Sequence, residues 1–400
     1  MTIFLEKDKH EINNLVCFRS GAMAINNHMK IPALPSIYSR HKDLSREIDV
    51  FYSLPQNGVN EDTGLLMYIC GFRGHAEASV FKKLRNNFAD DYNLITVQCN
   101  YFGYEFMQKP QKLRPQDKHM DYFTKEELIK IYKRGDFHIE EFIKLAEKYP
   151  VKMLLREDLS DECPENFNEM GIMQAIDNLN ALITVMKIVT SMGYKFNSKK
   201  IIFFGNSQGA YLSYLCNILA PDLISLIIDN SGWLYPEHLE KDKRVLTLTP
   251  GKSTLKIVFD YKARDIIDDF QILDLKKMYD RFDNKAKIIS FHGEGDHLIS
   301  LEDKVKFLSN INDSEIYRIT NETLETYPSD IFKNSDHGLG AHFLNLFRYV
   351  LENHNLNFEK NLEFNLPKNN YLETDDYRYI FDYTGRMPVI AKCEKQKTNK

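Results

Sequence analysis

Apolar residues along this chain alternate between short continuous runs and stretches with helical spacing. Seven of the runs are six to eight residues long and predict β-strands, because strands of globular proteins have this length and composition. They lie at residues 48–54, 64–70, 93–99, 200–205, 223–230, 286–293 and 314–320. Uninterrupted runs such as IIFF suit strands that are covered on both faces. The alternation therefore predicts an α/β protein with a mostly parallel central sheet.

Two segments between these strands have the spacing of amphipathic helices. Residues 169–189 place apolar side chains on one stripe, and residues 340–354 do the same over two turns. Helices that connect parallel strands cover the faces of a sheet, so both are expected to pack on the central sheet.

Two further segments interrupt the alternation and predict insertions. In residues 107–166, Thr124 and Glu127 form a capping box, and Gly135-Asp136 is typical of a helix stop followed by a new N-cap. Residues 231–285 are mixed aromatic and charged. We therefore predict a core of residues 1–106 and 167–354, a helical cap at 107–166 and a second cap segment at 231–285. Residues 355–400 form a polar C-terminal extension, in which YRYIFDY predicts a late strand.

Composition and charge exclude several classes of function. The net charge of −5 gives no reason to expect a nucleic acid or an anionic membrane as partner. The N-terminus has no basic segment followed by an apolar one, and no apolar run approaches the length that spans a bilayer. The six cysteines are scattered without a CxxC pair, which predicts buried free thiols and a cytoplasmic protein. They are Cys17, Cys70, Cys99, Cys163, Cys216 and Cys393.

The stretch Gly205-Asn206-Ser207-Gln208-Gly209 matches G-x-S-x-G between a predicted strand and a predicted helix. So sharp a reversal strains the central residue and needs small neighbours, because larger side chains would collide with the strand and the helix. The turn lifts the serine hydroxyl clear of the sheet. It also aims the N–H of Gln208 to where an oxyanion would form, beside the positive end of a helix. Ser207 is the candidate nucleophile.

A serine nucleophile needs a base and a group that orients the base. In this architecture the acid and the histidine follow the serine in that order, each after a later strand. His337 lies in the Gly-rich loop NSDHGLG and is our candidate base. The other histidines fit less well, since His292 lies inside a strand end and His342 starts a helix. His297 is next to the candidate acid and would point away from it.

The candidate acid is Asp296, in the loop after the strand that ends at Gly293. Glu294 and Asp229 are the alternatives, and Asp229 is better placed to shape the floor of the site. A second oxyanion donor is expected after the second predicted strand, where the backbone N–H of Phe72 is the candidate. Arg73 is a tentative ligand for an anionic substrate group, or a solvated loop arginine.

Together the G-x-S-x-G turn and the later HGEGD and DHG segments resemble the α/β-hydrolase superfamily over residues 45–354. HGEGD is similar to the acid loop of prolyl-oligopeptidase-type and acyl-esterase members, although no β-propeller precedes it. In its length and overall sequence character the chain also resembles a poorly characterised group of bacterial α/β hydrolases found near flagellin-glycosylation genes. The superfamily implies helices on both faces of the sheet, Ser207 as nucleophile, His337 as base and Asp296 as its partner, with no metal or organic cofactor.

The resulting hypothesis is a serine hydrolase that cleaves a small-molecule or glycan acyl ester through an acyl-enzyme. An acyltransferase would use the same residues with a sugar or amine acceptor in place of water. A non-catalytic binding protein on the same fold is the alternative of a different class. In each case the two insertions are expected to cap the pocket.

Overall fold

A computed structural model describes residues 24–41, 44–107, 113–115, 118–133, 136–239 and 244–395. The chain divides into two units. Unit 1 is formed by Met1–Phe102, Met170–Tyr235 and Asp269–Lys400, and unit 2 by Gly103–Glu169 and Pro236–Asp268. Unit 2 thus leaves the chain of unit 1 at two points, after the fourth and the tenth strand.

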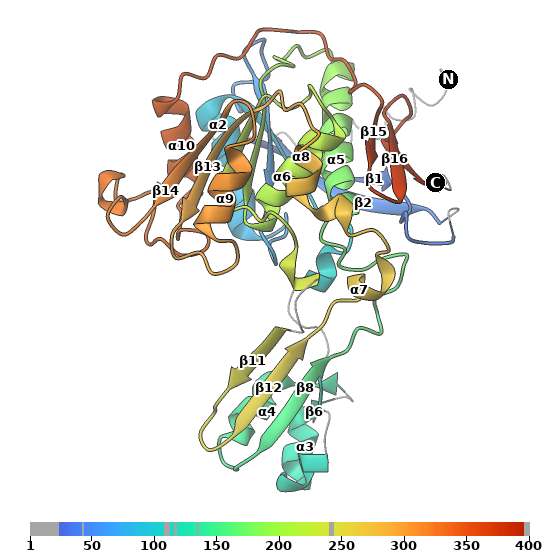
Figure 1. Ribbon diagram of the computed structural model, residues 1–400, viewed down its shortest axis with the longest axis vertical. Helices are drawn as coiled ribbons and strands as arrows, with labels where there is room; N and C mark the ends of the chain where they lie inside the picture. The colour runs from blue at the N-terminus through green and yellow to red at the C-terminus, as the bar shows by residue number, and fades with distance from the viewer. Residues whose placement is uncertain are drawn as a thin grey trace. The chain divides into compact units, whose positions relative to one another are not determined.

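Unit 1 is built on a sheet of eight strands among the described residues (Figure 1). Their order is β1-β2-β4-β3-β9-β10-β13-β14. The strands from β4 to β14 run parallel, β2 is antiparallel to β4, and β1 is antiparallel to β2. Their bounds are β1 (Ile25–Ala33), β2 (Arg46–Leu54), β3 (Gly64–Ile69), β4 (Leu94–Cys99), β9 (Ile201–Asn206), β10 (Leu226–Asn230), β13 (Lys287–Gly293) and β14 (Ser314–Ile319).

All seven strands predicted from the sequence are present, each within three residues of its expected ends. The edge strand β1 was not predicted. Its residues alternate between half-buried and exposed over most of its length, so it lacks the continuous apolar run by which the other strands were recognised.

Helices cover both faces of this sheet, as the sequence predicted. On one face α2 and α10 pack on the central strands, where the ring of Phe88 lies 4.9 Å from that of Phe347 and 6.1 Å from that of Phe204. On the other face α6 contacts β3, β9 and β10, and α5 and α8 contact α6. The helices of unit 1 are α2 (Ser79–Tyr92), α5 (Ile172–Ser191), α6 (Gln208–Leu219), α8 (Leu275–Tyr279), α9 (Leu301–Leu308) and α10 (Phe343–Asn353).

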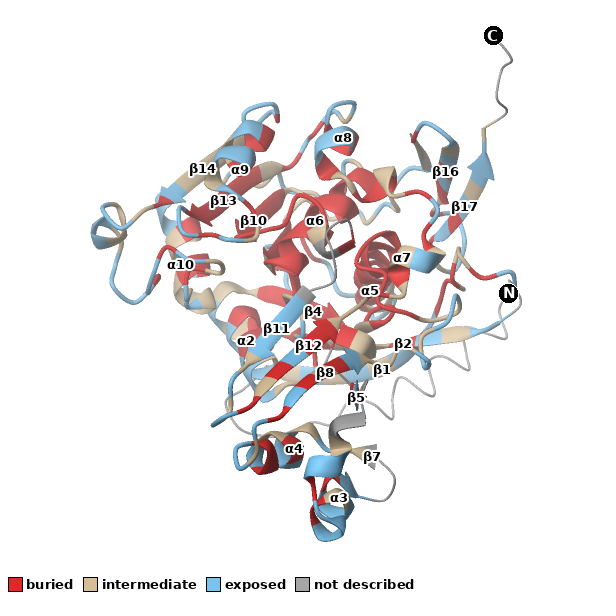
Figure 2. Ribbon diagram, turned by 60° about the horizontal axis from the view of Figure 1, so that its bottom comes forward, coloured by how far each residue is buried: buried red, intermediate tan, exposed pale blue. Residues whose placement is uncertain are grey.

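Every residue of α6 and most residues of α5 are buried (Figure 2). Among the described helices, α5 alone is long and apolar enough to cross a membrane by length and composition, with a mean hydropathy of 1.3. This corrects our expectation that no apolar run approaches that length. In the fold, 83% of the apolar window is buried, because α5 packs on α6 and on the sheet.

Unit 2 contains a second sheet, of order β11-β12-β8-β5, which the sequence analysis did not predict. Its strands are β5 (Leu113–Pro115), β8 (Lys152–Glu157), β11 (Arg244–Leu248) and β12 (Thr254–Phe259), and a small pair is formed by β6 (Tyr132–Lys133) and β7 (Asp136–Phe137). The central pair, β8 and β12, joins the two insertions, with Leu155 opposite Ile257. Apolar side chains of both insertions form one core. The helices of unit 2 are α3 (Lys125–Ile131), α4 (Ile139–Ala146) and α7 (Ala263–Ile266).

The helical pair predicted in the first insertion is present as α3 and α4. The capping box is confirmed: the Thr124 side chain accepts from the N–H of Glu127, and the Glu127 carboxylate accepts from the N–H of Thr124. The predicted N-cap at Asp136 is wrong, because that residue pairs in β7 and His138 precedes α4. Gly135 lies outside the described residues.

The observed boundaries of unit 2 differ from the predicted cap segments of 107–166 and 231–285. The difference is largest at residues 269–285, which belong to unit 1 and include α8. Aromatic and charged composition did not separate α8 from the insertion, since a short helix that covers α6 has the same mixture of residues.

The C-terminal extension belongs to unit 1 and packs on the rest of it. Its sheet has the order β15-β16-β17, with strands β15 (Asn370–Glu373), β16 (Tyr377–Asp382) and β17 (Val389–Glu394), and β16 is the predicted late strand. The Tyr383 hydroxyl donates to the carbonyl of Leu219 at 2.7 Å, and the Tyr379 hydroxyl donates to Asp269 at 2.9 Å. Short 3-10 helices lie at Tyr104–Met107, Lys118–Tyr122, Glu237–Leu239, Gln271–Leu273 and Leu324–Thr326.

The prediction of free, buried thiols is confirmed for Cys70, Cys99 and Cys216. Cys163 and Cys393 are also free, but the prediction that they are buried is wrong. Cys163 lies in an exposed loop and Cys393 on the outer strand β17. Cys17 lies outside the described residues.

Candidate active site

The chain reverses between β9 and α6 at Ser207, which has φ 55° and ψ −119°. A non-glycine residue with positive φ is uncommon, and here the surrounding strand and helix impose it. The N–H of Ser207 donates to the carbonyl of Asn230 at 2.8 Å, so the turn is anchored to the end of the neighbouring strand β10. The predicted strand–turn–helix geometry is therefore present.

The two glycines of the motif are required by close backbone contacts. A Cβ on Gly209 would lie 2.0 Å from the carbonyl oxygen of Ile69, at the end of β3. A Cβ on Gly205 would lie 2.2 Å from the backbone nitrogen of Ala210. Any side chain at either position would push the helix away from the sheet, and Ser207 would move with it.

Three residues from distant parts of the chain meet at this turn. The Oγ of Ser207 lies 2.7 Å from Nε2 of His337, and Nδ1 of His337 lies 2.8 Å from Oδ2 of Asp296. Ser207 and Asp296 are both 7% exposed. The carboxylate can only accept, so it fixes the proton of the neutral imidazole on Nδ1 and leaves the lone pair of Nε2 facing the hydroxyl.

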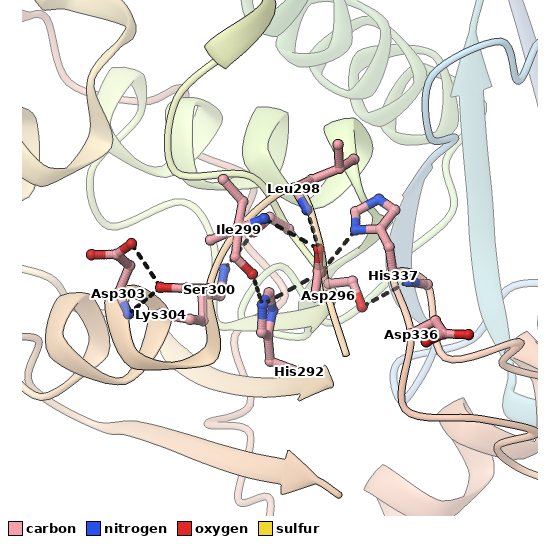
Figure 3. A network of polar contacts seen from close by, with 12 residues as sticks. His292, Asp296, Leu298, Ile299, Ser300, Asp303, Lys304, Asp336 and His337 are labelled. Carbon is pink, nitrogen blue, oxygen red and sulfur yellow. Dashed lines mark hydrogen bonds and ion pairs between the residues drawn. The ribbon is translucent and has the colours of Figure 1, made fainter. Parts of the chain in front are cut away.

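The carboxylate of Asp296 is held from several sides (Figure 3). Its Oδ1 accepts from the backbone N–H groups of Leu298 at 2.9 Å and Ile299 at 3.2 Å. Burial opposes the charge. The hydrogen bond from His337, its electrostatic interaction and that of His292, and the N–H of Leu298 outweigh burial and hold the pKa of Asp296 below its ordinary value. A carboxylate held ionised in this way keeps the imidazole oriented.

His292 supports Asp296 from the side opposite His337. Its Nε2 lies 2.9 Å from the carbonyl of Ile299 and 3.4 Å from Oδ2 of Asp296, so the Nε2 proton faces two acceptors (Figure 3). Burial, and then the charge of Lys304, lower the pKa of His292. A neutral His292 is therefore a structural donor, in agreement with the role expected from its place in a strand end.

The alternative acids are occupied elsewhere. Asp229 forms a buried ion pair with Lys304, with 2.6 Å between Oδ2 and Nζ. Burial alone would raise its pKa, but Lys304 and the hydroxyl of Tyr214 lower it below the ordinary value. Glu294 is exposed and accepts from the N–H of Asn321 at 2.7 Å.

The alternative histidines have other surroundings. His342 is the N-cap of α10, and its Nδ1 accepts from the N–H of Asn345 at 3.3 Å. The ring of His297 is exposed, and its centroid lies 6.3 Å from that of His337.

The predicted oxyanion donors lie on two segments beside Ser207. The N–H of Gln208 is in the first turn of α6, where an α-helix offers no internal acceptor. Its side chain is buried and donates to Gln174 at 2.8 Å. Phe72 follows Gly71, at which a Cβ would lie 3.4 Å from the Cβ of Ser207. The two segments thus meet at the nucleophile turn.

Arg73 lies in a tight turn, in which the N–H of Gly74 donates to the carbonyl of Gly71 at 2.8 Å. Its φ is 71° and its side chain is exposed. Both readings of Arg73, an anion ligand and a solvated loop residue, are compatible with this exposed position.

Sequence reasoning missed the two residues that follow Asp229, at the end of β10 and directly after it. Asn230 and Ser231 contact the turn of Ser207 and the loop of His337. A usable signal was present, because the carboxyl ends of neighbouring parallel strands meet at one edge of a sheet. Among the described residues, no group of three or more His, Cys, Asp or Glu side chains is placed to hold a metal ion.

Comparison with known families gives one match. Residues 117–240 match a family described as "Protein of unknown function (DUF2920)". The matched region includes Ser207 and ends before Asp296 and His337. A comparison with curated proteins finds no match.

Solved structures that match this chain include a peptidase and two esterases, all at low sequence identity. The acylaminoacyl peptidase of Pyrococcus horikoshii is 15% identical, with 82% of this chain and 40% of the peptidase covered and a TM-score of 0.45. Est1E of Butyrivibrio proteoclasticus, with ferulic acid bound, is 15% identical over 76% of this chain and 95% of its own, with a TM-score of 0.42. Esterase 2 of Thermogutta terrifontis, phosphonylated by sarin, is 10% identical, with 80% of this chain and 91% of the esterase covered and a TM-score of 0.41. The chain spans less than half the length of the peptidase.

Strand order identifies the fold from the chain itself. A sheet of order β1-β2-β4-β3-β9-β10-β13-β14 with β2 antiparallel, and a serine turn after β9, is the arrangement of the α/β-hydrolase fold. The predicted fold class and the resemblance to this superfamily are confirmed.

Proposed function

We propose, on this α/β-hydrolase fold, a serine hydrolase that cleaves an ester bond through an acyl-enzyme on Ser207. One observation carries the proposal: a hydrogen-bonded chain runs from the Ser207 hydroxyl through His337 to the buried Asp296. A serine hydroxyl is a weak nucleophile unless a base takes its proton as it attacks.

In the first half of the reaction, Oγ of Ser207 attacks the ester carbonyl and its proton passes to Nε2 of His337. The imidazolium that forms keeps its Nδ1 proton and donates it in a hydrogen bond to Asp296, and the negative charge of Asp296 stabilises the imidazolium. The tetrahedral intermediate then collapses, the bond to the alcohol breaks, and His337 gives its proton to the leaving oxygen.

In the second half, a water molecule gives a proton to His337 and attacks the acyl-serine. Collapse of the second intermediate releases the acid and returns the proton to Ser207. In both halves the developing oxyanion is proposed to accept from the N–H groups of Gln208 and Phe72, with the N-terminus of α6 adding positive potential.

Labelling with a fluorophosphonate probe tests whether Ser207 is activated. The parent protein should be phosphonylated at Ser207, as peptide mapping would show, and Ser207→Ala should not react. Ser213→Ala is the matched control, since Ser213 is buried in the same helix and donates only to the carbonyl of Gly209. Equal labelling of the parent and Ser207→Ala, or no labelling of the parent, would refute the proposal.

Turnover of esters then defines the reaction. The substrates are p-nitrophenyl esters of increasing chain length and acylated sugars, and the second group follows from the resemblance noted in the sequence. Ser207→Ala or His337→Ala should lower kcat/KM by roughly 10⁴-fold or more. Release of free acid supports a hydrolase, whereas acyl transfer to an added sugar or amine in preference to water would identify an acyltransferase.

A further inference from the structure

Asn230, the last residue of β10, contacts both halves of the candidate site. Its carbonyl accepts from the N–H of Ser207 at 2.8 Å. Its side-chain Nδ2 donates to Oδ1 of Asn206 at 2.9 Å and to the carbonyl of Gly338 at 3.2 Å. Asn206 precedes the nucleophile and Gly338 follows the base, so one residue joins the two loops that carry them.

The orientation of the Asn230 amide follows from its contacts. The carbonyl of Gly338 can only accept, so a nitrogen must face it. That orientation leaves Oδ1 of Asn230 buried without a hydrogen-bond partner among the described residues. A buried acceptor without a partner costs stability, and such a group in a folded protein calls for an explanation.

Both backbone polar groups of Gly338 are bound by the segment at the end of β10. Its N–H donates to Oγ of Ser231 at 3.0 Å, while its carbonyl accepts from Asn230. Ser231 has φ 55°, so the extended backbone of β10 ends directly before it. The end of β10 thus fixes the backbone directly after His337 against the backbone of Ser207.

We propose that Asn230 is a positioning residue that sets the distance between the Ser207 hydroxyl and the His337 imidazole. The two groups are 130 residues apart in the chain and lie 2.7 Å apart in the fold. Asn230 links their loops directly, and a donor is needed at its Nδ2 because both partners are acceptors. The inference rests on the proposed function, since the distance matters only if His337 takes the proton of Ser207.

Two substitutions at Asn230 test the link. Asn230→Asp keeps the size but sets a carboxylate oxygen against two acceptors, and Asn230→Ala removes the side chain. Asn180→Asp is the matched control, because Asn180 is also buried and its Nδ2 donates to the carbonyl of Pro32, on an edge strand away from the site. The lone tryptophan, Trp233, is buried in unit 1 and reports by fluorescence that each variant is folded.

The measurement is the second-order rate constant of phosphonylation by the fluorophosphonate probe, followed by kcat and KM on the best ester. Both Asn230 variants should react roughly 10²-fold more slowly, since a displacement of about 1 Å in a reacting pair costs this much. The loss should appear in kcat with KM unchanged. The rate should rise with pH as His337 loses its proton, because only a neutral imidazole can act as the base. In Asn230→Asp this rise should occur at higher pH than in the parent, because an added negative charge beside the loop favours the imidazolium. Asn180→Asp should match the parent.

The outcomes separate the two proposals. Folded Asn230 variants that react as fast as a labelled parent would overturn the positioning role and leave the proposed function standing. An equal loss in Asn180→Asp would also overturn it, because the effect would then be one of general stability. A parent that is not phosphonylated would overturn the proposed function, and the positioning role with it.

Discussion

Replacing Lys304 by methionine should destabilise unit 1 and make its stability depend on pH. The Lys304 ammonium is fully buried and lies 2.6 Å from Oδ2 of Asp229, which is also fully buried. Methionine has a similar length and no charge, so it leaves the carboxylate without its counter-ion. Breaking a buried ion pair from one side typically costs about 3 to 5 kcal/mol.

The contacts that remain place the expected loss at the lower end of this range. Asp229 still accepts from the hydroxyls of Tyr214 at 2.8 Å and Ser290 at 2.9 Å and from the N–H of Gly232 at 2.7 Å. These neutral donors satisfy its lone pairs but do not balance its charge. We therefore expect the free energy of unfolding to fall by about 3 kcal/mol at pH 8.

The pH dependence follows from the pKa of Asp229. In the parent, Lys304 is one of the groups that lower this pKa against the opposing effect of burial. Without Lys304, burial dominates and the folded pKa of Asp229 rises above its unfolded value of about 3.9. The folded variant then binds a proton more tightly than the unfolded chain does. Its deficit should shrink as the pH falls from 8 towards 5.

Urea unfolding followed by the fluorescence of Trp233 measures the effect in unit 1. The double variant Asp229→Asn with Lys304→Met removes both charges and should regain at least half of the lost stability. A loss that is the same at pH 8 and pH 5, or a double variant no more stable than Lys304→Met, would contradict this account. The buried pair would then act through packing and not through charge.

The other predictions concern three single positions. Gly209→Ala should abolish probe labelling and lower the melting temperature, because its Cβ would lie 2.0 Å from the carbonyl oxygen of Ile69. Unchanged labelling would show that this close contact does not fix the position of Ser207. Asp296→Asn should lower kcat/KM by roughly 10⁴-fold, whereas an active Asp296→Asn beside an inactive Asp229→Asn would reverse the assignment of the acid. Because the folded pKa of Asp296 is depressed, its contribution to stability is present above about pH 3.9 and lost as the pH falls through the folded value. Acid titration of the parent and Asp296→Asn, followed by circular dichroism, checks this. Thr124→Ala should destabilise unit 2 by about 1 kcal/mol through loss of the α3 cap, and thermal unfolding measures it.

The sequence determined the elements whose signals are local. Continuous apolar runs marked the parallel strands, since a strand covered on both faces has no polar positions. The turn at Ser207 was recognisable because its glycines, the strand before it and the helix after it are contiguous in the chain. The capping box at Thr124 is equally local. The chain order of Ser207, Asp296 and His337 then named the residues that the fold brings together.

Only the tertiary structure decided among candidates that look alike in sequence. Asp229 and Asp296 both follow the apolar run of a parallel strand, and the difference is that Lys304, from a later helix, neutralises Asp229. The sheet of unit 2 could not be predicted either, because β8 and β12 come from separate insertions and gain their cores only by pairing. The role of Asn230 has the same origin. Its three hydrogen bonds reach segments far apart in the chain, and such long-range contacts leave no pattern in the residues around it.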